Sequence, residues 1–407
     1  MNNIKKLQII TLINGMTFYT PIFTLFLLIH NLNLGFIVAA QTMFTVGMLI
    51  STIPTGVLAD KWGQKRAMQI GLILIILTML SLVILHTPLM LLLFFVFRGI
   101  GVGFIDGADE ALLYDSYVHV NTNTNGYTRA FGKMLSNDTL GFVVATAVAG
   151  IAVQIFGKTS YIPLIVATAT ASTIALIITS TLQPLEHIMV KAQGIKFVNQ
   201  IKSGLKVVKQ TRTIFALTIL GLLTLNGEYF LRQTYQPYFQ NLAVPAIFLG
   251  LALSGGKLLN FFAMRNVHHL EKFFTVDKML LWINLALGAS FILLAFANSV
   301  FLVVAVFMLI QAIMNSQQPI VSDYVNQQIQ PGQRTTTLST VSFIQNIGQI
   351  IARLLLGISI GLIGLGHTYI AQGIYVLAGT VIGIWYIRSC GCVHRIHHSM
   401  DSIPEAM

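Results

Sequence analysis

The feature that most constrains this chain is the recurrence of apolar segments about as long as a membrane is thick. They fall near residues 7–29, 35–58, 67–86, 89–113, 139–156, 161–182, 213–236, 245–264, 277–297, 299–322, 336–362 and 367–387. A helix needs roughly 20 apolar residues to cross a bilayer, whereas a barrel strand is about half that length and alternates. Because a helix satisfies its own backbone polar groups in lipid, the pattern predicts twelve transmembrane α-helices.

The composition agrees with a chain that faces lipid over most of its surface. Of the 407 residues, 55% are hydrophobic and only 9% are charged, and the mean hydropathy is +0.77. A soluble domain carries roughly 25% charged residues. A chain this apolar cannot cover a water-facing surface, so we expect a multi-pass protein of the cell membrane surrounded by the lipid bilayer.

Basic residues gather on one side of the predicted membrane, which predicts the orientation. Every connection on that side carries lysine or arginine, whereas Lys158 is the only such residue on the other side. The asymmetry predicts that both termini are cytoplasmic and that the number of spans is even. It also explains the formal net charge of +11 without nucleic acid as a partner.

Both ends of the chain allow an alternative interpretation. The apolar run after Lys6 is longer than the 7–15 residues of a signal-peptide core and lacks a small-residue cleavage site, so we interpret it as an uncleaved first span. Near the other end, Cys390 and Cys392 lie close to His394 in the sequence. A metal site is the alternative to free thiols in a cytoplasmic tail, which is the reading we prefer.

The longest predicted loop divides the sequence into halves. Apolar residues within it recur at helical spacing among lysines, at Ile195, Val198, Ile201, Leu205 and Val208. This pattern predicts an amphipathic helix along the cytoplasmic membrane surface. The predicted domains are a six-helix bundle at 1–182, a linker at 183–212, a second six-helix bundle at 213–388 and a tail at 389–407.

Short matches relate the two halves to each other. The sequence YTPIF at 19–23 recurs as YQPYF at 235–239, and DSYV at 115–118 recurs as DYV at 323–325. Arg129, which opens the fifth span, matches Arg334, which opens the eleventh. The offsets run from 205 (129 to 334) to 216 (19 to 235), close to half the chain. Matches in one order at nearly one offset indicate an internal repeat of six spans.

The loop between the second and third predicted spans carries a motif. Residues 56–66 read GVLADKWGQKR and resemble the loop signature G-x-L-A-D-[RK]-x-G-[RK]-[RK] of the major facilitator superfamily. The resemblance extends to the twelve spans, the basic central loop and the repeat, so it covers the whole chain. It implies an all-α secondary transporter of two pseudo-symmetric six-helix bundles, similar to bacterial drug and metabolite exporters. The chain departs from the signature at Gln64, where the family usually has a base.

In this family the motif forms a cytoplasmic latch with an acidic residue that ends the fourth span. The resemblance therefore implies a gating role for Gly56, Asp60, Lys61, Gly63, Lys65, Arg66 and Asp115. A glycine lets two helices approach closely, and a carboxylate at a helix end accepts charge-assisted hydrogen bonds. A generic basic loop that only fixes topology is the alternative.

Several charged residues lie within predicted spans, where a charge is costly unless it faces a partner or a cavity. The candidates for coupling or cavity lining are Arg98, Asp106, Asp109, Glu110, Glu228, Arg232 and Lys257. Structural alternatives remain for each. In these alternatives, Arg98 would pair with a polar neighbour, and the three acidic residues would share a solvated helix face near the cytoplasmic boundary. Glu228 and Arg232 would pair with each other at i and i+4, and Lys257 would extend its ammonium to the membrane surface.

The fifth span resembles the antiporter signature G-x-x-x-G-P-x-x-G-G only in its small residues. Residues 141–150 read GFVVATAVAG, which keeps the register of small residues and lacks the proline. Helix packing alone requires small residues, so the pattern is neutral on the direction of transport.

No enzyme signature, phosphate-binding loop or spaced His/Cys metal set occurs in the sequence. We therefore predict no enzymatic activity, no cofactor and no metal, and energy from an ion gradient or from the substrate's own gradient. The predicted function is proton-coupled efflux of amphipathic small molecules by alternating access, carried out by a monomer. Tyr19, Tyr229 and Tyr235 are candidates for lining the substrate cavity, although aromatic residues in spans mostly serve packing.

Three other functions compete with efflux. A symporter would take up a nutrient or metabolite through the same fold. A non-transporting scaffold or receptor would have little reason to keep Arg98 and Glu228 in lipid. A channel would lack the cytoplasmic latch and would show no saturation of flux.

Overall fold

A computed structural model describes residues 2–85, 87–120, 127–183, 211–224, 227–266, 274–314, 316–317, 321 and 334–389, with the backbone alone at 52–61, 118–120, 128, 212–213, 222–224 and 334–339. All regular structure in these residues is helical, which confirms the predicted all-α fold. Seven ranges among them are long and apolar enough to cross a membrane. The count of twelve spans stays a prediction, because residues 129–180 and 340–389 each form one range that covers two predicted spans.

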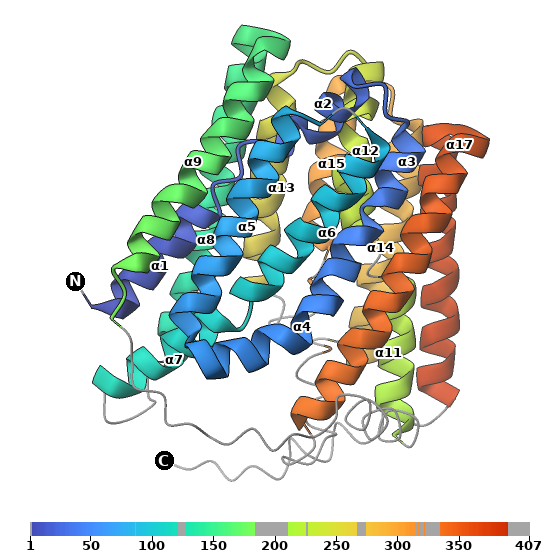
Figure 1. The fold of residues 1–407 in the computed structure, drawn as a ribbon. Helices are drawn as coiled ribbons and strands as arrows, with labels where there is room; N and C mark the ends of the chain where they lie inside the picture. The colour runs from blue at the N-terminus through green and yellow to red at the C-terminus, as the bar shows by residue number, and fades with distance from the viewer. Residues whose placement is uncertain are drawn as a thin grey trace. The chain divides into compact units, whose positions relative to one another are not determined.

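The first half of the chain forms helices of unequal length. They are α1 (Asn3–Asn14), η1 (Thr20–Ile22), α2 (Phe23–Ile29), α3 (Leu34–Ala40), α4 (Thr42–Trp62), α5 (Gln64–Val83), α6 (Pro88–Ile105), α7 (Ala108–Val120), α8 (Tyr127–Phe156), η2 (Gly157–Ser160) and α9 (Tyr161–Ser180). Figure 1 shows their course. The first and fourth predicted spans are each broken into separate helices.

The second half follows the same plan. Its helices are α11 (Arg212–Thr224), α12 (Gly227–Asn241), α13 (Ile247–Asn266), α14 (Val276–Phe296), α15 (Val300–Ile313) and α17 (Arg334–Ser389). Helix α17 joins the last two predicted spans across a kink at Gly364, whose φ of 76° favours glycine. The predicted amphipathic linker helix and the cysteine-containing tail lie outside the described residues.

The chain divides into two compact units that cut across the halves of the sequence. Unit 1 comprises Met1–Gln193, Arg232–Leu258 and Arg353–Gly361, and unit 2 comprises Gly194–Leu231, Leu259–Ala352 and Leu362–Met407. Unit 1 thus takes two segments from the second half of the sequence. The predicted bundles at 1–182 and 213–388 stay a prediction.

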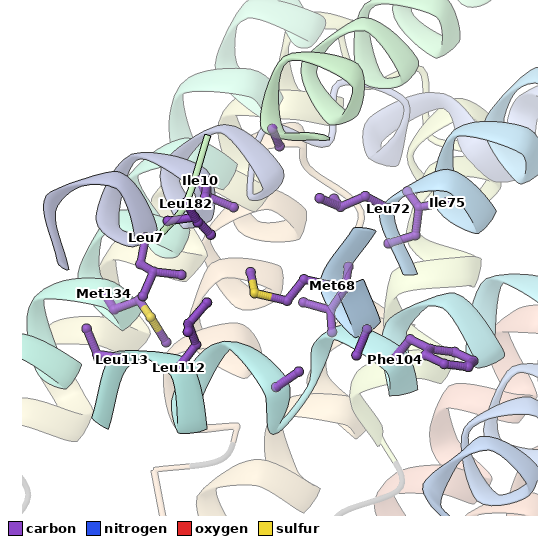
Figure 2. Packing of buried hydrophobic residues seen from close by; sticks show 14 residues of the cluster. Leu7, Ile10, Met68, Leu72, Ile75, Phe104, Leu112, Leu113, Met134 and Leu182 are labelled. Atoms are coloured by element: carbon purple, nitrogen blue, oxygen red, sulfur yellow. The ribbon is translucent and has the colours of Figure 1, made fainter. Parts of the chain in front are cut away.

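In unit 1, α4 packs along α6, α5 packs against α6 and α9, and α1 packs against α8 and α9. A buried apolar cluster lies where these helices meet α7, and Figure 2 shows its side chains pointing toward one another. The residues labelled there are Leu7, Ile10, Met68, Leu72, Ile75, Phe104, Leu112, Leu113, Met134 and Leu182. Apolar burial gives no driving force between helices in lipid, so this cluster stabilises the unit mainly by close packing.

In unit 2, α14 packs against α15 and aromatic rings fill the centre. The fully buried Tyr369 stacks on Phe291 at 6.4 Å between ring centroids and meets Phe230 edge-on at 5.4 Å. At one end of the unit, the guanidinium of Arg388 forms an ion pair with Asp277 at 2.9 Å.

The fourth and tenth predicted spans carry the same backbone feature, one in each unit. Helix α6 starts at the hydroxyl cap of Thr87 and ends at Asp106, with φ −58° and ψ 125°. Helix α15 starts at the hydroxyl cap of Ser299 and ends at Met314, with φ −55° and ψ 136°. In both, the closing N–H donates to the carbonyl four residues earlier. The offset from Asp106 to Met314 is 208, so the repeat extends to the geometry of the helix ends.

Candidate functional site

The first span is broken within unit 1, where residues of both sequence halves meet. Helix α1 ends at Asn14, the chain turns through Gly15 to Tyr19, and α2 starts at Phe23 after a short 3-10 turn that contains Pro21. Added atoms on Gly15 would collide with the backbone carbonyl of Asp138 on α8. The first N–H groups of a helix have no partner within that helix, so those at the start of α2 need acceptors from another part of the protein.

Gln236 of α12 supplies those partners. Its Oε1 accepts from the N–H groups of Thr24 at 2.8 Å and Leu25 at 3.2 Å, and its Nε2 donates to the carbonyl of Thr20 at 2.9 Å. One turn earlier, Gln233 accepts from the Thr24 hydroxyl at 2.8 Å. Gln236 is 1% exposed. We call this set of three bonds from the Gln236 side chain the Gln236 cap.

Two glycine contacts join helices of the two sequence halves within unit 1. Gly35 of α3 lies against Gly357 of α17, and Gly150 of α8 lies against Gly250 of α13, so closely that a side chain on any of the four would collide with the opposite backbone. The positions correspond in the repeat, because 35 to 250 is an offset of 215 and 150 to 357 is an offset of 207. The small residues of the fifth span therefore serve close helix packing here.

Hydrogen bonds accompany these glycine contacts. The hydroxyls of Thr146 on α8 and Ser254 on α13 lie 2.7 Å apart. Between α17 and α4, the guanidinium of Arg353 donates to the hydroxyl of Thr45 at 2.7 Å, and Arg353 is 1% exposed. In unit 1, helices of the two sequence halves are thus joined by small residues, by a hydrogen bond between two hydroxyls and by a hydrogen bond from an arginine to a hydroxyl.

Arg98 and Tyr19, two sequence-predicted cavity residues, lie together. The guanidinium carbon of Arg98 is 5.7 Å from the centroid of the Tyr19 ring, within the range of a cation–π interaction. One of its nitrogens, Nη1, is buried and has no hydrogen-bond partner among the described residues. Tyr19 directly precedes Thr20 of the Gln236 cap, so this cation lies beside the break of the first span.

The acidic group of the fourth span differs from the single helix face that the sequence predicts. Asp106 ends α6, Gly107 has a φ of 85°, and Asp109 and Glu110 occupy the first turn of α7. The break rotates the later residues away from the α6 periodicity, because only glycine takes that backbone conformation readily. Asp106 and Glu110 are exposed and Asp109 is half-buried.

Tyr127, before the fifth predicted span, donates a long hydrogen bond of 3.4 Å to Glu110. Burial, with a contribution from the Glu110 charge, raises the pKa of Tyr127 to about 12. The hydroxyl therefore stays protonated at physiological pH and keeps its role as a donor to the carboxylate.

Asp138 is the acidic residue that the sequence analysis missed. Helix α8 begins at Tyr127 rather than near residue 139, so Asp138 lies roughly 16 Å along the helix. Its carboxylate interacts with the negative charge of Asp106 and with the positive charge of Lys257 on α13. The signal was present, because the segment from 127 to 138 contains no proline or glycine pair that would stop a helix.

The remaining predicted cavity residues lie on α12 and α13. Glu228, Tyr229 and Lys257 are half-buried. The guanidinium carbon of Arg232 is 5.9 Å from the ring centroid of Phe142 on α8.

Tyr235, also predicted to line the cavity, is fully buried within unit 1. Its hydroxyl donates to the carbonyl of Leu249 at 2.8 Å. Its polar atom is satisfied by the backbone, so it packs α12 against α13.

The motif at 56–66 contains a contact that the resemblance does not imply. The Nε2 of Gln64 donates to Oδ2 of Asp115 on α7 at 2.9 Å, so the residue that departs from the signature meets the predicted acidic partner. Gly63 joins α4 to α5 with a φ of 90°, which explains why this position is glycine. Arg66 is exposed. The predicted roles of Gly56, Asp60 and Lys61 depend on side chains outside the described part of the chain.

Lys65 binds the end of α9. Its ammonium donates to the carbonyls of Ser180 and Leu182, both at 2.7 Å. Lys6 donates to the carbonyl of Thr181 at 2.6 Å. The last carbonyls of a helix carry partial negative charge, so two ammonium groups stabilise this end just before the predicted linker.

Broken membrane helices in corresponding positions of two repeats, with charges kept among them, define a secondary transporter. The chain belongs to the Major Facilitator Superfamily, whose model matches residues 7–271. It is therefore a multi-pass membrane protein of a transporter family rather than an enzyme.

Known relatives and solved structures agree with this assignment. The chain is 21% identical over 389 residues to YxaM of Bacillus subtilis (strain 168), described as an uncharacterized MFS-type transporter, and the match covers 90% of this chain and 91% of YxaM. A crystal structure of the nucleoside transporter NupG has a TM-score of 0.78 at 16% identity and covers 95% of this chain and 100% of NupG. A D-xylose-proton symporter has a TM-score of 0.68 at 12% identity, with 94% and 95% covered. At these identities the structures show a shared fold.

Proposed function

We propose that this transporter couples movement of a small molecule to the proton gradient by alternating access. The observation that carries this proposal is the group of carboxylates within the spans of unit 1. The charges of Asp106 and Asp138 interact with each other. Asp138 also interacts with Lys257, which lies on a helix of the other sequence half. A carboxylate whose charged neighbours change during the cycle changes its affinity for a proton, which is the requirement for coupling.

The proposed direction is export of amphipathic compounds. The motif of residues 56–66 resembles that of drug and metabolite exporters. The Tyr19 ring and the Arg98 guanidinium, side by side at the break of the first span, offer an aromatic face and a cation to such a compound. Large aromatic surfaces suit apolar parts of a ligand, and a few placed polar groups fix its orientation.

Uptake of a polar solute is the second candidate. Unit 2 buries the amides of Asn260, Asn284, Gln317 and Gln372, and a polar solute is recognised by hydrogen bonds of this kind. One nitrogen of Gln372 has no hydrogen-bond partner among the described residues. The similarity to structures named as a nucleoside transporter and a xylose-proton symporter supports this alternative.

Flux into proteoliposomes tests both candidates. The purified chain is reconstituted, and a panel of amphipathic drugs, nucleosides and sugars is offered under an imposed proton gradient, a sodium gradient or none. We expect amphipathic compounds to accumulate against their gradient when protons flow the opposite way. Accumulation with protons flowing the same way would replace export by uptake, and accumulation under sodium alone would contradict proton coupling.

Two variants locate the coupling carboxylate. Glu228→Gln and Asp138→Asn keep the side-chain shape and remove the charge. If either residue carries the proton, gradient-driven accumulation should fail while exchange of substrate down its own gradient survives. Ser136→Ala, on α8 beside Asp138, is the matched control and should retain both activities. A variant that still accumulates substrate fully excludes its residue as the coupling site.

A further inference from the structure

The repeated sequence Tyr-x-Pro-x-Phe places its two copies in contact with each other. Thr20 and Gln236 occupy the same position in the two copies, and the side chain of Gln236 bonds the backbone of Thr20. The copies therefore meet near the axis that relates the repeats. Only the second copy has a side chain there that is long enough to reach the other backbone, so the contact is asymmetric.

The Gln236 cap does what a helix's own N-cap residue normally does. With Phe23 as the first residue of α2, Thr24 and Leu25 occupy the second and third positions, whose N–H groups a cap residue accepts. The residue before α2, Ile22, has no side-chain cap bond. Gln236 thus replaces a missing local cap with one supplied by another helix.

We propose that Gln236 is a state-dependent cap that holds the outer side of the transporter closed and must leave α2 when that side opens. The inference rests on the proposed alternating access. The loop after α2 lies on the side that carries few lysines and arginines in the sequence, which the charge asymmetry predicts to be the outer side. When the outer side opens, the two copies of the repeated sequence separate, and water reaches the backbone groups at the break of the first span.

The neighbouring contacts show why Gln236 is suited to this role. The pairs Gly35–Gly357 and Gly150–Gly250 set how closely the helices approach, and glycine contributes no polar side chain. The Gln236 cap adds three directional bonds to the backbone at the break, and two of them go to N–H groups of the first turn of α2, which a helix does not satisfy itself. An unsatisfied buried backbone group is costly, so loss of the cap favours the open, hydrated state.

Sided thiol labelling tests the proposal without any substrate. Cys390 and Cys392 are replaced by serine so that an introduced cysteine is the only thiol. The reporter is Ser254→Cys, a nearly isosteric change at a residue that is 5% exposed, whose hydroxyl lies 2.7 Å from that of Thr146 where α13 meets α8. An impermeant maleimide is added from outside to intact cells, and from the cytoplasmic side to inverted vesicles, and the labelling rate is followed.

Gln236→Leu is the main variant. We expect the reporter to label from outside faster by roughly tenfold or more, which corresponds to about 1.4 kcal/mol of lost closed-state stability. Gln240→Leu is the matched control, because it is the same substitution one turn later on α12 at an exposed position. Thr24→Val removes only the hydroxyl bond to Gln233 and should have a smaller effect.

Gln236→Glu separates the hydrogen bonds from packing. In this variant the protonated carboxyl can still accept from α2 and donate to Thr20, whereas the ionised carboxylate has no donor and places an oxygen against the Thr20 carbonyl. Arg232, one turn earlier on α12, and Arg98, whose guanidinium carbon is 5.7 Å from the Tyr19 ring, favour the ionised form. Labelling relative to the Gln236 parent at each pH should therefore rise as the pH rises.

The outcomes are distinguishable from those of the flux experiment. Unchanged labelling in Gln236→Leu, or an increase equal to that of Gln240→Leu, overturns the proposal. Faster labelling only from the cytoplasmic side also overturns it. If Gln236→Leu is not recovered in the membrane, the pH dependence of Gln236→Glu decides, and a flat profile contradicts the cap. Increased labelling in a protein that moves no substrate would support the cap and count against the proposed function.

Discussion

The helix ends at α6 and α15 have the same backbone conformation but different surrounding side chains. Asp106 and Met314 end their helices with nearly the same dihedral angles. The break in unit 1 is followed by carboxylates with exposed or half-buried side chains. The break in unit 2 is bound by Asn260, whose Nδ2 donates to the carbonyls of Ala312 and Met314.

The difference separates two roles that a broken membrane helix can have. Released backbone carbonyls must be satisfied, and in unit 2 a neutral amide from a neighbouring helix does so, which fixes the break. In unit 1 the break carries charges, and the charge of Asp106 interacts with that of a further acidic residue, Asp138, on another helix. We infer that duplication kept the backbone of the break, while its surroundings became structural in one copy and electrostatic in the other.

The largest expected effect is on transport, from a charge at the break of unit 1. Asp106→Asn removes the charge that interacts with Asp109 and Asp138. We expect proton-driven accumulation to fall by about 5- to 150-fold, which is the change that typical coupling free energies produce. Because Asp106 is exposed and an amide keeps its shape, thermal stability should change little. A large fall in Tm with normal accumulation would reverse the roles of the two breaks.

The next largest effect is on stability, from the break of unit 2. Asn260→Leu removes the donor from two carbonyls at a buried position. Leaving a buried polar group unsatisfied costs about 1–3 kcal/mol. We expect a lower Tm in detergent, measured as loss of the monodisperse peak after heating, with pH dependence of transport unchanged. Asn266→Leu, at the exposed end of the same helix, is the matched control.

These predictions depend on features that hydropathy does not report. The spans were predictable because about 20 apolar residues are needed to cross lipid and because a motif marks one loop. The break at Gly107 was not, since one glycine in an apolar run does not by itself predict a positive φ. Asp138 was missed because the polar turns before residue 139 lower hydropathy without ending the helix. Gln236 is a neutral amide, and only the backbone it meets reveals its role.

The motif at 56–66 gives a smaller effect within unit 1. Gln64→Leu removes the bond to Asp115 and leaves a half-buried carboxylate with one donor fewer. Hydrogen bonds to charged groups contribute about 1.5–3 kcal/mol, and only the part that differs between states of the cycle affects the rate, so the transport rate should change several-fold. Gln64→Arg restores the base of the family signature and should retain the contact as an ion pair. Equal rates in wild type and Gln64→Leu would remove this contact from the gating account.

Asp60→Asn tests the latch that the family resemblance implies, at a residue whose side chain lies outside the described part of the chain. We expect slower transport with normal amounts of protein in the membrane, because the change removes a charge and little volume. Its rate compared with that of Gln64→Leu ranks the two contacts. Wild-type flux in Asp60→Asn would leave the Gln64–Asp115 bond as the working contact of the motif.

The smallest effect should come from Asn284, although it is as buried as any amide in unit 2. Its Nδ2 donates to Leu280 of its own helix at 2.9 Å and to Oε1 of Gln317 at 2.7 Å, and it is 0% exposed. Its Oδ1 is buried and has no hydrogen-bond partner among the described residues. Asn284→Leu therefore removes an orphan acceptor together with two bonds, one of which is a donor to the buried Gln317 side chain.

The two contributions oppose each other in the free energy of unfolding. An unsatisfied buried acceptor costs about 1–3 kcal/mol, and an average hydrogen bond contributes about 0.5–1.5 kcal/mol. We expect Asn284→Leu to change stability by less than about 1 kcal/mol, well below Asn260→Leu, in the same thermal assay. The same substitution at two buried asparagines then separates an amide that satisfies the broken backbone from one that does not. If both lowered Tm equally, loss of amide packing rather than the helix break would explain the stability of unit 2.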